Sequence, residues 1–114
     1  IPDFIEFAAR RLGLAFPDAR PVPFGHMGDG NLHYNVSQPE GGDKQAFLAQ
    51  RAEINAIVHG LVQEFGGSIS AEHGIGVLKR DLLKQVKDPV ALDLMRAIKS
   101  TLDPAGILNP GKLL

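Results

Sequence analysis

The stretch GHMGDGNLHYN, residues 25–35, places two histidines around three glycines and an aspartate. After the last glycine, LHYNV alternates apolar and polar residues, which is typical of a strand with one buried face. His26 and His33 are seven positions apart, so along one straight strand their side chains would lie on opposite faces. A turn at Gly28–Gly30 removes this obstacle. The stretch therefore predicts a β-hairpin that brings both histidines to one face.

The polar face of this hairpin is suited to a metal ion. His26 and His33 would lie within reach of one ion, and Asn35 follows His33 on the same face. Catalytic zinc sites commonly join two imidazoles to a carboxylate and leave one coordination position open. A histidine pair on a hairpin is also often solvated or hydrogen-bonded across the strands, so the pair alone leaves both interpretations open.

A second stretch, SAEHGIG at residues 70–76, is expected to form a glycine-rich loop. Glu72 and His73 are adjacent in it, so their side chains should diverge. Glu72 can then supply the carboxylate of the metal site, while His73 can act as a base, since its pKa ordinarily lies near neutral pH. A Glu-His pair in such a loop can equally be exposed polar sequence.

Helical periodicity surrounds these two stretches. Apolar residues spaced by three and four predict helices over residues 2–12, 43–65, 77–86 and 89–102. Asp43 and Asp88 are suited to cap the second and the last of these helices, and Gly13 and Gly66 to end the first and the second. The segment AFPDARPVPF holds three prolines and is expected to be an extended strand or a loop.

Composition sets the class of protein. A chain of 114 residues with 44% hydrophobic residues, 22% charged residues and a net charge of -1 is expected to be one globular domain. With no polybasic run, one Tyr and no Trp, nucleic acid is not an expected partner. The absence of cysteine fits a reducing compartment, and the charged start is unlike a signal peptide, so we expect a cytoplasmic protein. The start at Ile1, without Met, suggests a piece of a longer protein.

Three motifs, GHMGDGNLHYN, SAEHGIGVLK and DPAGILNPGKLL, together resemble the C-terminal part of FAD-linked oxidases of the vanillyl-alcohol oxidase superfamily. The resemblance points to the D-2-hydroxyacid dehydrogenase branch, which includes glycolate oxidase flavoprotein subunits, D-lactate dehydrogenases and D-2-hydroxyglutarate dehydrogenases. It implies an α+β fold, with an antiparallel sheet covered by helices, as the C-terminal segment of the cap domain. It also implies that the flavin-binding domain lies outside residues 1–114.

The resemblance further implies roles for single residues. His26, His33 and Glu72 would hold a divalent metal, with zinc as the expected ion. His73 would take the hydroxyl proton of a small 2-hydroxy acid, and the C2 hydride would go to FAD. Asn35 is similar to an asparagine that lines the substrate site.

The C-terminal NPGK segment and the expected partners of the chain add further expectations. Asn109, in NPGK, resembles a residue of a segment that returns toward the flavin, so a cofactor contact is expected there. The expected partners are the hydroxy acid and the flavin-binding domain, and exposed apolar surface can pair copies of the chain into a homo-oligomer. The isolated chain is expected to be inactive. The same ligands also fit a stand-alone metal-binding module, or a zinc hydrolase that activates water through Glu72 or His73, although no helical H-E-x-x-H pattern is present.

Overall fold

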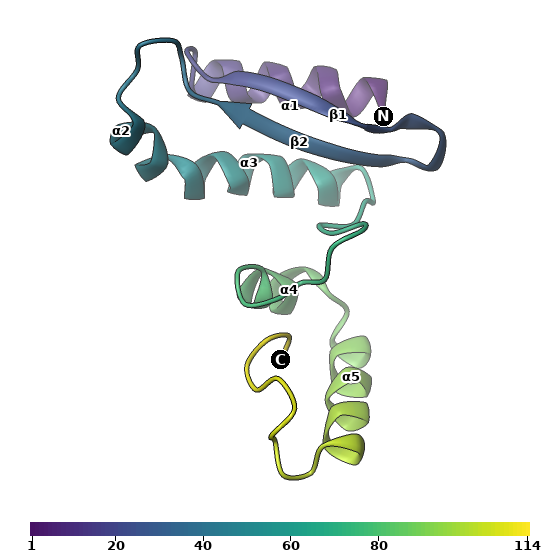
Figure 1. Ribbon diagram of the computed structural model, residues 1–114. Helices are drawn as coiled ribbons and strands as arrows, with labels where there is room; N and C mark the ends of the chain where they lie inside the picture. Colours follow the sequence, from purple (N-terminus) through teal and green to yellow (C-terminus); the bar gives the residue numbers. More distant parts are fainter. The chain divides into compact units, whose positions relative to one another are not determined.

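A computed structural model describes residues 1–114 of the protein. Its elements, in chain order, are α1 (Pro2–Ala15), β1 (Arg20–His26), the 3-10 turn η1 (Met27–Asp29), β2 (Asn31–Ser37), α2 (Lys44–Ala49), α3 (Arg51–Glu64), α4 (Arg80–Val86) and α5 (Pro89–Leu102) (Figure 1). The chain forms two compact units, Ile1–Ile69 and Ser70–Leu114. The predicted α+β class, with an antiparallel sheet and helices, is confirmed.

The first unit is built around the predicted hairpin. β1 and β2 pair antiparallel, with Phe24 opposite His33 and His26 opposite Asn31. The chain reverses through η1 and Gly30, whose φ of 75° is left-handed. Gly25 allows the strands to approach closely, because a Cβ on it would lie 2.5 Å from the Asn31 carbonyl oxygen. A glycine is therefore required where β1 enters the turn.

Helices cover one face of this sheet. Phe4 of α1 meets Tyr34 of β2 edge-on, with ring centroids 5.8 Å apart, and meets Phe65 at 5.7 Å. The sheet residues on the same side as Tyr34 are half-buried: Pro21, Pro23, Leu32 and Val36. On the other side, Val22, Phe24 and His26 are exposed. The hairpin thus has a covered apolar face and an open face that carries the histidines.

The core of the first unit lies between α1 and α3. Leu12 of α1 and Leu61 of α3 are fully buried, and Ala8 and Ile54 are buried beside them. Burying one leucine contributes about 1.5–3 kcal/mol, so these contacts dominate the packing of the two helices. The apolar spacing of both helices, seen in the sequence, is what turns these residues inward.

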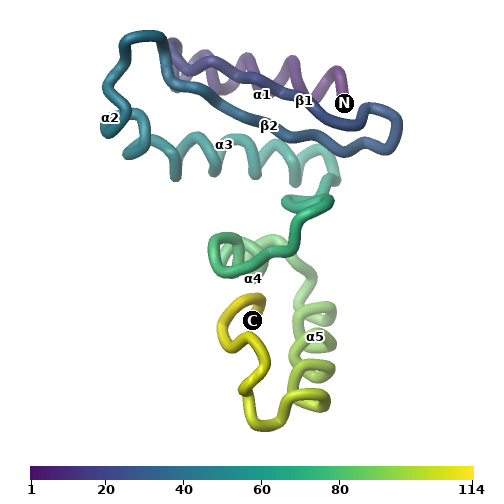
Figure 2. Tube along the Cα trace, in the orientation of Figure 1, coloured from purple at the N-terminus to yellow at the C-terminus, as the bar shows by residue number.

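The second unit holds α4, α5 and the C-terminal segment, whose chain turns back after α5 toward α4 (Figure 2). Its buried apolar residues are Leu83 of α4 and Leu92 of α5. Asp88 caps α5 as predicted, because its carboxylate accepts the Val90 and Ala91 amides at 2.9 and 3.2 Å.

Three predicted helix boundaries differ from the structure. The helix predicted over residues 43–65 is two helices, α2 and α3, because the Gln50 amide bonds to the Phe47 carbonyl, three residues back, and tightens the turn. α4 begins at Arg80, after a turn closed by the Arg80 amide on the Val77 carbonyl. α1 continues past Gly13 and ends just before Pro17. None of the helices combines the length and the apolarity that crossing a bilayer requires.

Candidate functional site

The open face of the hairpin holds the two predicted histidine ligands. His33 lies opposite Phe24 and His26 lies opposite Asn31, so the two histidines are diagonal neighbours on the same face. The Phe24 ring stacks on the His33 imidazole, with centroids 5.0 Å apart and an interplanar angle of 14°. This stacking limits the orientations of the His33 ring.

Asp29, a residue to which the sequence assigned no role beyond the turn, lies beside His26. Its carboxylate oxygen Oδ2 lies 3.9 Å from His26 Nδ1, an ion-pair distance and not a hydrogen bond. The other oxygen accepts the Asn31 amide at 3.4 Å. Carboxylates beside the ring nitrogen of a histidine commonly orient it toward a metal. The spacing His-x-x-Asp across a turn is the sequence signal that could have revealed this pair.

Asn35, the predicted substrate residue, is exposed on the same face two residues after His33, opposite Val22. Its carboxamide offers two donors and one acceptor oxygen. An exposed amide beside imidazoles is suited to a carboxylate of a small ligand.

Glu72 and His73 lie in the second unit, in the loop between Ser70 and Gly76. Both side chains are exposed, and the Ser70 hydroxyl donates a hydrogen bond to the His73 carbonyl, which closes the loop. The predicted ligand set is thus divided between the units, two imidazoles in the first and one carboxylate in the second. In neither unit do three His, Asp or Glu side chains lie close enough together to hold a metal ion.

The donors nevertheless have the chemistry that a divalent metal requires. Two imidazoles and a carboxylate form the ligand set of several catalytic zinc sites. The Asp29 carboxylate lies 3.9 Å from His26 Nδ1, beyond the hydrogen bond that a histidine ligand of a metal usually donates to a carboxylate. These residues are of the types that such an ion prefers, and their joint role as its ligands stays a prediction.

Asn109, the predicted cofactor residue, has an unusual backbone. Its φ of 46° makes it the only residue other than glycine with a positive φ. It begins a turn through Pro110 and Gly111, closed by the Lys112 amide on the Asn109 carbonyl at 3.4 Å. The Asn109 side chain is exposed.

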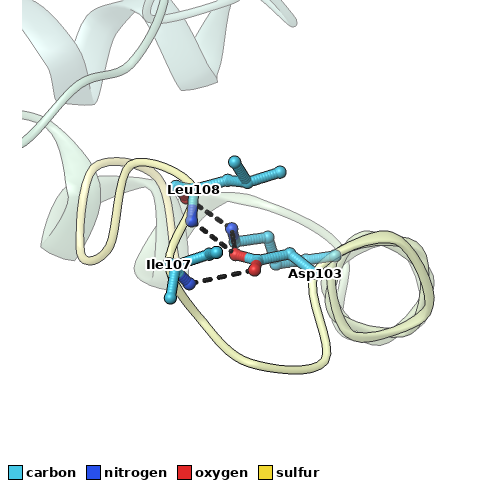
Figure 3. A network of polar contacts seen from close by, with 4 residues as sticks. Asp103, Ile107 and Leu108 are labelled. Atoms are coloured by element: carbon cyan, nitrogen blue, oxygen red, sulfur yellow. Dashed lines mark hydrogen bonds and ion pairs between the residues drawn. The ribbon is translucent and has the colours of Figure 1, made fainter.

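A buried ion pair supports the chain before Asn109. The Asp103 side chain is only 3% exposed; it pairs with Lys99 and accepts the Ile107 and Leu108 amides at 2.9 and 3.0 Å (Figure 3). The hydrogen bond from Lys99 is the main reason why the pKa of Asp103 lies below its ordinary value, although burial opposes the shift. The sequence showed Asp103 only as the first residue of the DPAG turn, which gives no sign of burial.

A largely apolar cavity of about 500 Å³ separates α5 from the C-terminal segment. It lies within the second unit and contains none of the predicted metal or substrate residues, although Asn109 is part of its lining. The residues of its wall include Met95, Ile98, Leu102, Leu108 and Leu113. Lys99, Asp103 and Lys112 also border this cavity, but most of its lining is apolar.

Known proteins resemble this chain over its whole length. Residues 1–113 match the family model described as FAD linked oxidases, C-terminal domain. A D-2-hydroxyglutarate dehydrogenase of Stutzerimonas stutzeri is 44% identical over 113 residues, which is 99% of this chain and 24% of that protein. The enzyme of the same name from Xanthomonas citri is 43% identical, again over 99% of this chain and 24% of its own.

A plant relative extends the comparison. The mitochondrial D-2-hydroxyglutarate dehydrogenase of Arabidopsis thaliana is 46% identical over 84% of this chain, which is 16% of the plant protein. The chain thus spans about a quarter or less of the length of these curated relatives. The resemblance expected from the three motifs is confirmed. The chain belongs to the family of FAD-linked oxidases and represents their C-terminal domain.

Proposed function

We propose that this chain is the C-terminal, substrate-binding part of an FAD-dependent dehydrogenase that oxidises a D-2-hydroxy acid to the 2-keto acid. The family match supports the flavin enzyme, and the names of the relatives support a substrate of the 2-hydroxyglutarate kind. The observation that carries the proposal is the open hairpin face, on which His26 and His33 lie together with Asn35.

His26, His33 and Glu72 would hold a divalent metal, with zinc as the first candidate. When bound, such an ion supplies positive charge that lowers the pKa of a hydroxyl group. Asp29 lies beside His26 at 3.9 Å, and the Phe24 ring stacks on the His33 ring. The orientation of His33 is thus restricted before substrate arrives.

The remaining residues act on the hydroxy acid. His73 would accept the hydroxyl proton of the substrate, and FAD, when bound, would supply the acceptor for the C2 hydride. Asn35 donates from its carboxamide to the substrate carboxylate. The substrate would leave as the 2-keto acid, with its hydroxyl proton on His73 and the C2 hydrogen and its electron pair passed to the flavin, so protons and electrons balance.

The partner of this chain is the flavin-binding part of the same enzyme, and the proposed location is the cytoplasm, although the relative from Arabidopsis is named mitochondrial. A stand-alone metal-binding module and a zinc hydrolase would use the same ligands. Membership of an FAD-linked family favours the oxidoreductase over both.

The test separates the metal ligands from the base in the flavin-containing enzyme. The His33→Ala variant should bind zinc or manganese about tenfold more weakly or worse, since even residues that only support metal ligands contribute that much. The His73→Ala variant should keep its metal affinity and lose turnover of D-2-hydroxyglutarate with a dye acceptor. Metal affinity is measured by calorimetry and turnover by dye reduction.

His59 of α3, a histidine outside the proposed site, supplies the matched control, and His59→Ala should change neither measurement. Unchanged metal affinity in His33→Ala would remove that residue from the ligand set. Equal loss of metal in His33→Ala and His73→Ala would contradict the division between ligand and base.

A further inference from the structure

The segment around Asn109 combines an uncommon backbone conformation with supports on both sides. The left-handed φ of Asn109, 46°, is a conformation that asparagine tolerates better than most residues. Residues in such conformations persist where the surrounding structure holds them, and they occur often at functional sites. The contacts on either side of Asn109 show how it is held.

The support before Asn109 is the Lys99–Asp103 pair. The Asp103 carboxylate accepts the amides of Ile107 and Leu108, and the Lys99 ammonium bonds to both the carboxylate and the Leu108 carbonyl (Figure 3). These are charge-assisted hydrogen bonds, the stronger class. Any other path of the chain at Ile107 and Leu108 would leave a buried carboxylate without its donors, which is unfavourable.

The support after Asn109 comes from Arg80, the first residue of α4. Its Nη1 donates to the Gly111 carbonyl at 3.0 Å, and a Cβ on Gly111 would lie only 3.3 Å from the same nitrogen. Gly111 has a φ of 68°, as the third position of the turn requires. The main chain is therefore fixed immediately before and immediately after the Asn109–Pro110 pair.

We propose that Lys99 and Asp103, with Arg80, are positioning residues that hold Asn109 in one conformation for its contact with the flavin. The proposal rests on the proposed function, and on the cofactor contact that the family resemblance leads us to expect for Asn109. All the supporting bonds go to the main chain of neighbouring residues, while the Asn109 side chain is exposed. A side chain presented in a fixed conformation loses less entropy when it binds, so flavin affinity should depend on these supports.

The experiment measures FAD affinity of the full-length enzyme, from the quenching of flavin fluorescence when the apoprotein is titrated. Asn109→Ala should weaken FAD binding. Asp103→Asn should also weaken it, by about tenfold, the lower end of what residues that orient a ligand contact contribute in metal sites. Lys99→Met should behave like Asp103→Asn, whereas Lys99→Arg, which keeps a charged donor, should retain most of the affinity.

The double variant Asp103→Asn/Asn109→Ala distinguishes positioning from general stability. If Asp103 acts through Asn109, the double variant binds FAD no more weakly than Asn109→Ala alone. Asp93→Asn, which breaks an exposed pair with Arg96 on the same helix, is the matched control and should leave FAD affinity unchanged. Thermal unfolding of each variant checks that it is folded.

The outcomes separate this proposal from the function on which it rests. Additive losses in the double variant, or full affinity in Asp103→Asn and Lys99→Met beside a weakened Asn109→Ala, would overturn the positioning role alone. Unchanged affinity in a folded Asn109→Ala variant would overturn the role of Asn109 itself. An unaltered full-length protein that binds no flavin would overturn the proposed function.

Discussion

Asp103 is the residue whose environment departs most from what its type suggests. Aspartate is rarely buried unless it is paired, and here one carboxylate meets an ammonium group and two amides. Three charge-assisted bonds compensate for the loss of water around it. These bonds hold the turn that follows α5, up to Leu108, in place.

A pH series tests this pairing. The pKa of Asp103 is lowered in the folded state, chiefly by Lys99, whereas an unfolded aspartate has a pKa of about 3.9. Its stabilising effect is therefore complete above that pH and disappears as pH falls through the lower folded pKa. We expect the difference in melting temperature between the unaltered chain and Asp103→Asn to narrow as the pH falls from about 5 through the lowered folded pKa. A constant difference across this range would contradict the pairing.

Single residues were predictable where spacing alone determined their position. The shared face of His26 and His33 follows from the turn between them and the period of two along a strand. The Asp103–Lys99 pair did not follow, because whether a turn carboxylate is buried depends on a tail that folds back over it. The roles of Glu72 and His73 stay predictions.

The helices show which of their boundaries are determined by the residues next to them in the sequence. Asp88 followed by Pro89 predicted the start of α5, and the structure has the cap at that position. The break between α2 and α3 was not predictable, since Gln50 itself keeps right-handed helical angles, φ -81° and ψ -7°. A break of that kind leaves the spacing of apolar residues nearly intact, so periodicity cannot detect it.

The Asp88 cap of α5 should contribute to the stability of the fold. Asp88→Ala removes the acceptor of two amides and should lower the free energy of unfolding by about 1 kcal/mol. Asp93→Ala, in the exposed interior of the same helix, should change it by less than about 0.5 kcal/mol. Urea denaturation followed by circular dichroism measures both. If Asp88→Ala were as stable as Asp93→Ala, water would replace the Asp88 carboxylate at the two amides without loss of stability.

Over the whole molecule, more large apolar side chains are exposed than buried. Four exposed residues spaced by four along α5 form one stripe: Val90, Leu94, Ile98 and Leu102. The sequence predicted that this helix has an apolar face but not which part of it would be covered, because periodicity gives a direction and not a partner. Association of the chain into homo-oligomers stays a prediction.

A buried and an exposed leucine of α1 should differ strongly in their contribution to stability. Leu12→Ala should lower the free energy of unfolding by about 2–5 kcal/mol, because it opens a cavity between α1 and α3. Leu14→Ala, on the same helix at 82% exposure, should change it by less than about 0.5 kcal/mol. Chemical denaturation measures the pair. Similar losses in the two variants would show that the α1–α3 contact is not the core of its unit.

The prolines of β1 have a consequence for how the sheet can grow. Pro21 and Pro23 have no amide hydrogen, so the margin of β1 that faces away from β2 lacks two of the donors that an incoming strand needs. The corresponding margin of β2 contains no proline. A further strand would therefore find more amide donors beside β2 than beside β1. Pairing of hairpin copies at both edges, which a continuous sheet needs, is thereby disfavoured. Two prolines, and not charged side chains, give this protection against fibre formation.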